Sequence, residues 1–226
     1  AMFLRIEPGE GGRMLKVPHM QPATTVMLDL SKGEETLLKE CKSKTRYNIR
    51  LGLKKGVESK IVPRKRFPDF VRLLDQTTNR DQFSGHPNAY YQKMLDTLNG
   101  EAKAYLAMGF YEGRPLAANI MIDFAGVRTY LHGASSNLHR NVMAPYALHW
   151  HLIADAIEKD MKWFDFWGVA PVGASKKHAW SGISRYKYGF SGEVVEHPGT
   201  FDLPVKHLWY GAYRTVRVLR RLRIRL

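Results

Sequence analysis

The stretch AYLAMGFYEGRPLAANIMIDFAGVRTYLHG, residues 104–133, decides the fold class of this chain. It contains three apolar or aromatic runs of strand length, at 104–111, 116–124 and 127–133. The turn residues EGRP separate the first two runs, and the pair AG separates the last two. Strand-length runs joined by such short turns predict a three-stranded antiparallel meander.

Helical patterns stand on both sides of the meander. Ser31 followed by Glu34 has the spacing of a capping box, and apolar residues then recur at helical intervals until Gly56. The other expected elements are a strand at 24–30, helices after Pro68 and near Pro87, a helix at 144–161, a strand at 163–167, a segment around 183–190 and a strand pair at 193–202. This order predicts an α+β fold, in which a mixed, largely antiparallel central sheet is flanked by helices.

The charge balance points to an anionic partner. Lys and Arg number 35 against 21 Asp and Glu, which gives a formal net charge of +14. Such a charge favours nucleic acid, a nucleotide-linked substrate or acidic lipid as a partner, and simple solubility is the alternative. Cys41 is the only cysteine, so no internal disulfide forms and a cytoplasmic location is expected. No stretch approaches the roughly 20 apolar residues that a membrane span requires.

Six blocks of sequence carry a family resemblance. Residues 45–50 read TRYNIR and are followed at 54–57 by KKGV. The other blocks, in chain order, are RDQF at 80–83 with Tyr90 and Tyr91, YLHGASS at 130–136, residues 140–146 with Trp150, FDFWGV at 164–169 and the segment 182–192. In this order the blocks resemble motifs in the second domain of the Fem (FemABX) aminoacyltransferases, and they cover about residues 24–203.

The resemblance implies a fold, a domain organisation and a function. Fem enzymes contain two tandem GNAT-like acyltransferase domains, so residues 23–204 are expected to form the second one. Residues 1–22 are then a remnant strand, at 3–8, and a connector from a missing first GNAT-like domain, and residues 205–226 form a basic C-terminal helix. By resemblance, the chain moves an amino acid from aminoacyl-tRNA to the stem peptide of a UDP-linked or lipid-linked peptidoglycan precursor. No cofactor is expected.

The segment YKYGFSG, residues 186–192, is the densest candidate for chemistry. An aminoacyl ester is already activated, so amine attack needs alignment, loss of a proton and stabilisation of the oxyanion. The residues alone favour equally a ligand loop, whose glycines approach a ligand closely, and an aromatic hairpin. The resemblance ties Lys187 to the reacting centre, where it stabilises negative charge on the tetrahedral intermediate or the leaving ribose oxygen. It ties Tyr186 to the terminal adenosine of tRNA.

Other side chains are second-rank candidates. Asp165, on a short aromatic strand, orients or deprotonates the attacking amine, or it is a structural acceptor. By resemblance, His86, Tyr90 and Tyr130 contact the phosphates or the peptide of the precursor, and the alternative for the two tyrosines is a place in the core. Cys41 has no evident histidine partner and is expected to be a small buried residue.

Two basic stretches are candidates for binding anions. Lys42, Arg46, Arg50 and Lys54 recur every four residues and form one helical stripe, which either contacts tRNA phosphates or is solvated. The C-terminal run contains Arg214, Arg217, Arg220, Arg221, Arg223 and Arg225. It binds the anionic inner face of the membrane peripherally, binds tRNA, or forms a solvated helix.

Two other functions compete with aminoacyl transfer. Coenzyme A-dependent acyltransferases hold pyrophosphate on a Gly-rich turn, but residues 140–145 read RNVMAP and contain no glycine, which disfavours them. A non-catalytic module that binds RNA or the precursor is the second alternative. A metal site at His149 and His151 is not expected, because residues two apart on a helix point to different faces.

Overall fold

The computed structural model describes residues 1–7 and 14–223 and divides into two compact units, 25–194 and 1–24 with 195–226. Most of the glycine-rich part of the predicted connector, at 8–13, and the end of the basic tail, at 224–226, lie outside the described residues. The prediction that 1–22, 23–204 and 205–226 are separate regions stays a prediction. Each unit is described by itself.

The larger unit is built on a mixed sheet, which has seven strands among the residues described. In sheet order the strands are β4 (Glu58–Val62), β5 (Lys103–Tyr111), β6 (Arg114–Phe124), β7 (Val127–Ser135), β8 (Trp163–Gly168), β3 (Thr24–Asp29) and β9 (Glu193–Glu196). The predicted meander is confirmed, because β5, β6 and β7 pair antiparallel in sequence. β8 then pairs parallel to β7, which makes the sheet mixed.

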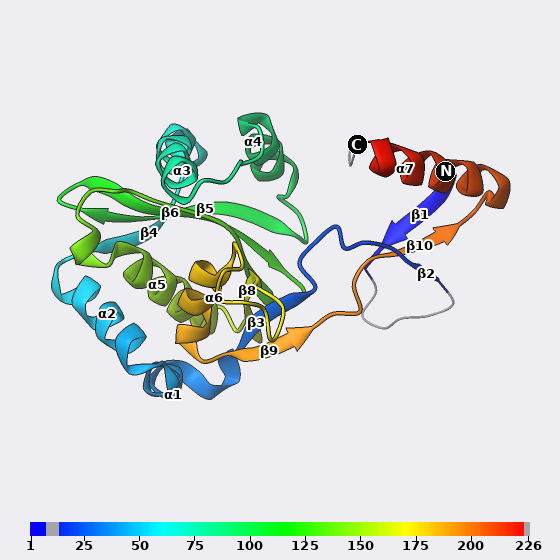
Figure 1. Cartoon of the computed structure of the whole chain (residues 1–226). Coiled ribbons are helices and arrows are strands. Elements are labelled where there is room, and N and C mark those ends of the chain that lie inside the picture. The colour runs from blue at the N-terminus through cyan, green and yellow to red at the C-terminus, as the bar shows by residue number, and fades with distance from the viewer. Residues whose placement is uncertain (8–13, 224–226) are drawn as a thin grey trace. The chain divides into compact units, whose positions relative to one another are not determined.

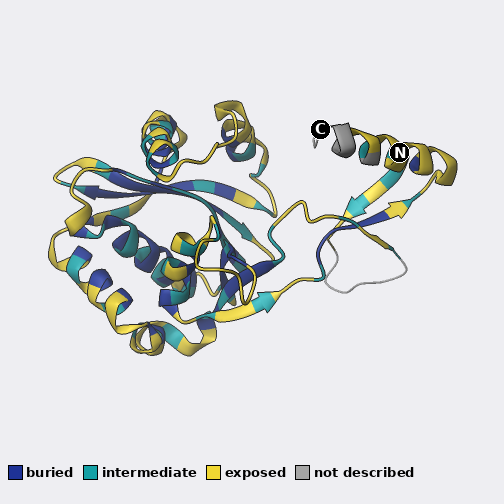
Figure 2. Cartoon of the chain, viewed as in Figure 1, coloured by how far each residue is buried: buried dark blue, intermediate teal, exposed yellow. Residues whose placement is uncertain are grey.

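Helices cover both faces of this sheet, as Figure 1 shows. α3 (Phe67–Asp81) and α4 (Asn88–Thr97) lie on one face, and their apolar side bears Phe70, Leu74 and Tyr91, as their spacing predicted. The other face bears α1 (Gly33–Glu40), α2 (Ser43–Lys54), α5 (Ala144–Glu158) and α6 (Ser181–Lys187). α5 is apolar over most of its surface and is therefore buried along much of its length (Figure 2).

The predicted single helix from Ser31 to Gly56 is wrong. Cys41 and Lys42 are extended, with ψ angles of 141° and 144°, and they separate α1 from α2. The break lets the Lys42 amide donate to the Gly189 carbonyl at 2.9 Å. The capping box is also absent, because Asp29 rather than Ser31 accepts the hydrogen bond at the start of this region, from the Ser31 amide.

The predicted pairing of strands within 193–202 is wrong as well. β9 lies beside β3, whereas β10 (Phe201–Pro204) pairs with β1 (Phe3–Ile6) and β2 (Leu15–Lys16) in a small antiparallel sheet of the second unit. Two strands close in sequence have therefore joined different sheets.

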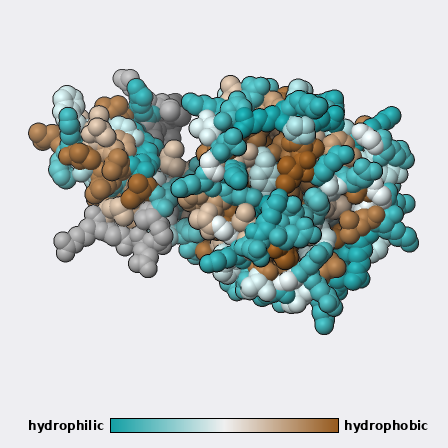
Figure 3. Space-filling model, turned by 180° about the vertical axis from the view of Figure 1, so that it is seen from behind, coloured by the Kyte–Doolittle hydropathy of each residue, from teal (hydrophilic) through white to brown (hydrophobic). Residues whose placement is uncertain are grey.

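The smaller unit packs α7 (His207–Arg223) against this small sheet. The Asp202 carboxylate accepts from Arg5 Nε at 2.6 Å and from the Tyr210 hydroxyl at 2.8 Å, and the Phe3 ring contacts the Tyr210 ring. The outward side of α7 is apolar, since Leu208 is 91% exposed and Trp209 66% exposed. In space-filling view, apolar side chains gather on this unit (Figure 3). No helix in the described part of the chain is both long and apolar enough to cross a membrane.

Candidate functional site

Lys187 lies at the end of a helix and not in a loop or a hairpin. α6 runs to Lys187 and a 3-10 turn (Tyr188–Phe190) follows it, so both conformations expected for this segment are wrong. The glycines expected to approach a ligand approach the protein instead. A Cβ at Gly189 would lie 2.1 Å from the Thr45 hydroxyl, and one at Gly192 would lie 2.6 Å from the Met27 carbonyl oxygen. These glycines therefore dock the turn against α2 and β3.

The Lys187 side chain is 5% exposed and points into the larger unit. Its Nζ donates to the Gly168 carbonyl at 2.7 Å and lies 5.3 Å from the centre of the Tyr130 ring. Burial lowers the pKa of Lys187 to about 7, although the Asp165 charge opposes this change. Near neutral pH, this amine can therefore either donate or accept a proton.

A strained strand end positions the Gly168 carbonyl. Trp167 has a φ of 58°, in the left-handed region that a tryptophan rarely occupies. The buried Asp165 carboxylate holds this conformation by accepting from the Trp167 amide at 2.7 Å. Asp165 in turn accepts from the Thr25 hydroxyl of β3. The contacts from Thr25 through Asp165 to Trp167 thus fix the position of the Gly168 carbonyl, which accepts the hydrogen bond of Lys187.

Aromatic side chains form the other wall of the Lys187 site. The Tyr130 ring contacts both Lys187 and His149, and the centre of the His149 ring lies 4.3 Å from its own at an angle of 88°. His149 Nδ1 lies 2.9 Å from both the Pro145 carbonyl oxygen and the Tyr186 hydroxyl. Burial, opposed by the bond to Pro145, lowers the pKa of His149 to about 4, so the ring is neutral at pH 7. Its Nε2 has no hydrogen-bond partner among the described residues.

The candidates for precursor binding divide between the two faces of the sheet. His86 and Tyr90 are exposed on the side of α4, with ring centres 4.2 Å apart. Tyr130 pairs with Met121, whereas His132 pairs with Ile120, so Leu131 is an extra residue that shifts the register. Tyr130 consequently faces α5 and Lys187, while His132 faces Tyr91 and the exposed pair. Their predicted roles in binding the precursor stay predictions.

The basic stripe is only partly available to a ligand. The Arg46 guanidinium donates to the Lys39 and Cys41 carbonyls at 2.7 and 2.9 Å and so caps the end of α1. Arg50 and Lys54 are exposed on α2. Contact of the three residues with tRNA stays a prediction.

The described residues offer neither a nucleophilic cysteine nor a cluster of metal ligands. Cys41 is 3% exposed, and burial raises its pKa to about 11, as expected for a small core residue and not a nucleophile. His149 is buried, whereas His151 is only partly so. Residues 1–7 and 14–223 contain no cluster of three or more side chains suited to a metal ion.

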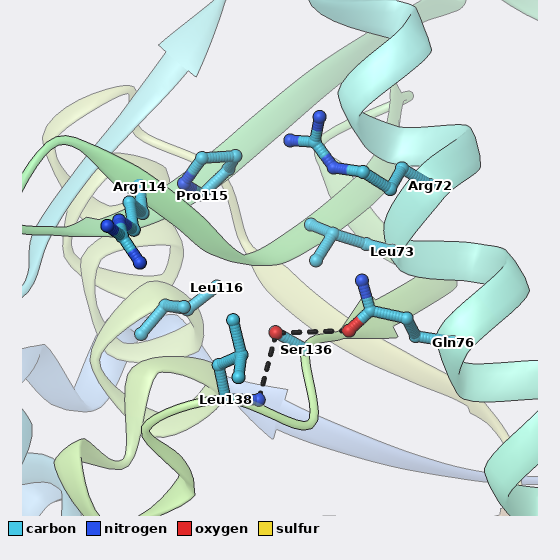
Figure 4. A pocket seen from close by; sticks show the side chains of 8 residues that line it. All are labelled: Arg72, Leu73, Gln76, Arg114, Pro115, Leu116, Ser136 and Leu138. Atoms are coloured by element: carbon cyan, nitrogen blue, oxygen red, sulfur yellow. Dashed lines mark hydrogen bonds between the residues drawn. The ribbon is translucent and has the colours of Figure 1, made fainter.

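A separate surface pocket of about 190 Å³ lies between α3 and the ends of β6 and β7 (Figure 4). Gln76 Oε1 accepts from the Ser136 hydroxyl at 3.1 Å on its floor, and Arg72 and Arg114 come from opposite walls. None of the side chains that line it belongs to the Lys187 site. This pocket is therefore distinct from the Lys187 site, whose side chains Lys187, Asp165 and Tyr130 are buried.

Sequence reasoning missed three parts of the site. Thr25 lies on the expected strand at 24–30, but nothing in the sequence marks it as a partner of Asp165, and the Gly168 carbonyl is a backbone group with no signal in the sequence. The sequence pattern suggests for His149 only a metal site, which is not expected there. Its place four residues after Pro145, whose carbonyl it binds, was the signal that could have shown a structural partner on the same helix.

The chain is similar in sequence to proteins named as aminoacyltransferases. Aminoacyltransferase FemA of Staphylococcus epidermidis is 29% identical over 107 residues, which is 47% of this chain and 25% of that protein. The lipid II:glycine glycyltransferase of Staphylococcus haemolyticus is 20% identical across 90% of this chain and 64% of its own length. The chain thus spans a quarter to under two thirds of these relatives.

Solved structures agree on the fold. The FemX crystal structure matches with a TM-score of 0.82 at 17% identity, covering 94% of this chain and 74% of FemX. The C-terminal domain of a lysylphosphatidylglycerol synthetase from Agrobacterium fabrum matches with a TM-score of 0.55 at 12% identity, covering 83% and 61%. These likenesses confirm the predicted α+β fold class, in which helices flank a mixed central sheet. Because the sequence model of the FemAB family matches residues 11–112 and 110–217, the chain belongs to that family.

Proposed function

We propose that this chain carries the reacting centre of an aminoacyltransferase, which moves an amino acid from aminoacyl-tRNA to the stem peptide of a peptidoglycan precursor. One observation carries the proposal: Lys187 is enclosed beside Asp165 and Tyr130, with a pKa near 7, on a motif of the FemAB family. The relatives named as aminoacyltransferases and as a lipid II:glycine glycyltransferase support this substrate class.

The reaction is an attack by the stem-peptide amine on the ester carbonyl. A C–N bond forms, the carbonyl oxygen becomes an oxyanion, and the C–O bond to the ribose then breaks. Lys187, as an ammonium, donates a hydrogen bond to the oxyanion, and its low pKa lets it pass a proton to the departing ribose oxygen. The neutral Lys187 then takes the proton that the attacking nitrogen loses. Asp165 keeps the ammonium form accessible through its charge.

The partners of the reaction follow from the same proposal. By the family resemblance, a first GNAT-like domain, on the same or another polypeptide, completes the binding of the precursor. The enzyme works in the cytoplasm, at the inner face of an anionic membrane, where its precursor is UDP-linked or lipid-linked. The composition of α7 supports peripheral membrane contact, since its outward side exposes Leu208 and Trp209 and no acidic residue follows Asp202.

The test is replacement of Lys187 by alanine. We expect the chain, supplied with a first GNAT-like domain, charged tRNA and a pentapeptide precursor, to form product that mass spectrometry detects. Lys187→Ala should lower the transfer rate by about two to three orders of magnitude, as for the loss of one oxyanion donor. Lys187→Arg should keep partial activity, because the charge remains but the donor geometry changes. Turnover of Lys187→Ala at the parent rate with saturating substrates would contradict the assignment.

A non-catalytic binding module is the second candidate. The low exposure of Lys187 and the burial of the Tyr186 hydroxyl against His149 favour it, because neither group meets solvent freely. The same experiment separates the two functions: a module binds precursor or RNA but gives no product in any variant.

A further inference from the structure

The segment 171–185, which contains most of the connection from β8 to α6 and the first five residues of α6, carries three cations and precedes Lys187 in the chain. No Asp or Glu occurs between Asp165 and Glu193, whereas Lys176, Lys177 and Arg185 all fall in this stretch. All three cations are exposed. The segment therefore carries positive charge, with no acidic residue near it in sequence, next to Lys187 in the chain.

Hydrogen bonds tie the two ends of the segment together at Lys187. The Ala170 amide, just before it, donates to the Ser184 hydroxyl at 2.8 Å. The Lys187 ammonium, just after it, donates to the Gly168 carbonyl at 2.7 Å. The segment is thus a closed loop whose base is the wall of the Lys187 site.

Turns within the segment fix its conformation. The Ala174 amide donates to the Pro171 carbonyl at 3.0 Å, and the His178 amide donates to the Ser175 carbonyl at 2.8 Å. The Trp180 amide then donates to His178 Nδ1 at 3.1 Å. A loop ordered in this way pays little conformational entropy when it binds a ligand.

The outward side chains combine cations with an aromatic ring. Trp180 is 42% exposed, although an indole ring of this size is usually buried. Lys176 and Lys177 precede it by only a few residues and are likewise exposed. Proteins hold single-stranded nucleic acid by this combination, in which cations track the phosphates and an aromatic ring stacks on a base.

We propose that the segment 171–185 is the binding surface for the single-stranded 3′ end of the aminoacyl-RNA, with Lys176 and Lys177 on its phosphates and Trp180 stacked on one of its bases. This inference rests on the proposed function. It assigns the acceptor end of the RNA to the loop that closes over Lys187, in addition to the α2 stripe, in which Arg46 already caps α1.

The geometry favours RNA over a lipid surface at this loop. A bilayer is bound through apolar area, which the outward side of α7 offers along one helix with Leu208, Trp209, Val216 and Leu219. The segment 171–185 instead exposes Val172, Trp180 and Ile183 among three cations. A stacked base needs only one accessible ring face with cations near it. A nucleic acid end held here would also carry its ester toward the base of the loop, where Lys187 lies.

The experiment measures binding of a fluorescently labelled short RNA, with the single-stranded 3′ sequence of tRNA, to the full chain by anisotropy. We expect Lys176→Glu with Lys177→Glu to weaken binding at least tenfold and to reduce the salt slope by about 1.4, since single strands release about 0.7 counterions per contact. Trp180→Ala should weaken binding about tenfold, and Trp180→Phe should keep most of the affinity. Lys93→Glu with Lys103→Glu, a pair of exposed lysines elsewhere in the larger unit, is the matched control.

Three outcomes would overturn the inference: parent affinity in all loop variants, an equal loss in the control pair, or displacement of the RNA by anionic lipid vesicles but not by unlabelled RNA. Circular dichroism confirms that each variant is folded. Because the assay needs no transfer, it separates the two proposals. If the loop variants weaken RNA binding but no transfer assay gives product, only the proposed function is contradicted. If product forms and the loop variants bind RNA as the parent does, only this inference is contradicted.

Discussion

Tyr130 and His132 stand two residues apart on β7, yet they face regions of opposite character. Tyr130 belongs to an enclosed cluster, in which Lys187 and Asp165 each bind backbone groups. His132 borders an aromatic group that opens to solvent through His86 and Tyr90. The extra residue at Leu131 produces the difference, because it turns neighbouring side chains to opposite faces. The enclosed side is suited to fixed chemistry, and the open side to a ligand that arrives from solvent.

The sharpest test of the enclosed side is the pH dependence of its stability. The folded pKa of Lys187, about 7, lies below its ordinary value of 10.5, so the unfolded chain binds more protons between these limits. Burial of the charged Lys187 therefore lowers the free energy of unfolding by its full amount below pH 7, and this loss becomes smaller as the pH rises toward 10.5. Lys187→Met should raise the free energy of unfolding at pH 6 by up to about 4 kcal/mol relative to the parent.

Denaturant titrations of Lys187→Met and parent at pH 6 and pH 10 measure this difference. We expect the gap between the two proteins to narrow at the higher pH. A gap that stays constant with pH would mean that Lys187 is not enclosed, and the contrast between the two sides would fail.

Gly133→Ala should disturb the enclosed side through the Tyr130 ring. A Cβ at Gly133 would lie 1.8 Å from the Tyr130 hydroxyl and 2.6 Å from the ring carbon that bears it, so the buried ring must shift. We expect a loss of about 3 kcal/mol in the free energy of unfolding, the scale of an overpacked core. Gly100→Ala is the control, because nothing lies within 4 Å of its Cβ. Equal melting temperatures for the two variants would show that Tyr130 is loosely held.

Thr25→Val should remove the hydroxyl that binds Asp165 while keeping the shape of the side chain. The buried carboxylate then lacks one donor, and we expect a loss of about 2 kcal/mol in stability. Thr25→Ser restores the hydroxyl and should recover most of it. Thermal unfolding of the three proteins checks the effect, and a serine variant as unstable as the valine variant would point to packing instead of the hydrogen bond.

His86→Ala is expected to have the smallest effect on the fold. His86 and the residues beside it in the chain are exposed to solvent, so the free energy of unfolding should change by less than about 0.5 kcal/mol. If the open side binds the precursor, isothermal titration with a pentapeptide precursor should show weaker binding by this variant than by Gly100→Ala. A stability loss as large as that of Gly133→Ala would erase the distinction between the two sides.

The parts of the molecule that follow local patterns could be predicted from the sequence. The meander, α3 and α4 each have the apolar period of their own element, and α5 is apolar along most of its length. The sequence also indicated Lys187 and Asp165 as candidates, and the structure brings these two side chains close enough for their charges to interact. The parts that depend on distant contacts could not be predicted. Nothing near Cys41 and Lys42 signals a helix break, because the Lys42 amide is bound by Gly189, far along the chain.

Glycine was the least readable signal. Gly189 and Gly192 correctly indicated close approach, but a sequence does not say whether a ligand or the protein itself comes near, and here Thr45 and Met27 do. The register shift at Leu131 also has no local signature in the sequence. The sequence therefore could not show that Tyr130 and His86 lie on opposite faces of the sheet. Roles carried by backbone groups, such as the Gly168 carbonyl, leave no trace in side-chain patterns.

The docking of Gly189 against Thr45 has a consequence for the order of folding. The two residues are far apart in sequence, so a long loop must close before they meet, and we expect the turn after α6 to dock late in folding. Lys187 sits just before that turn, and we expect its amine to stay open to solvent until the turn docks. Its reactivity toward an amine-modifying reagent, followed during refolding, would therefore time the step that encloses Lys187.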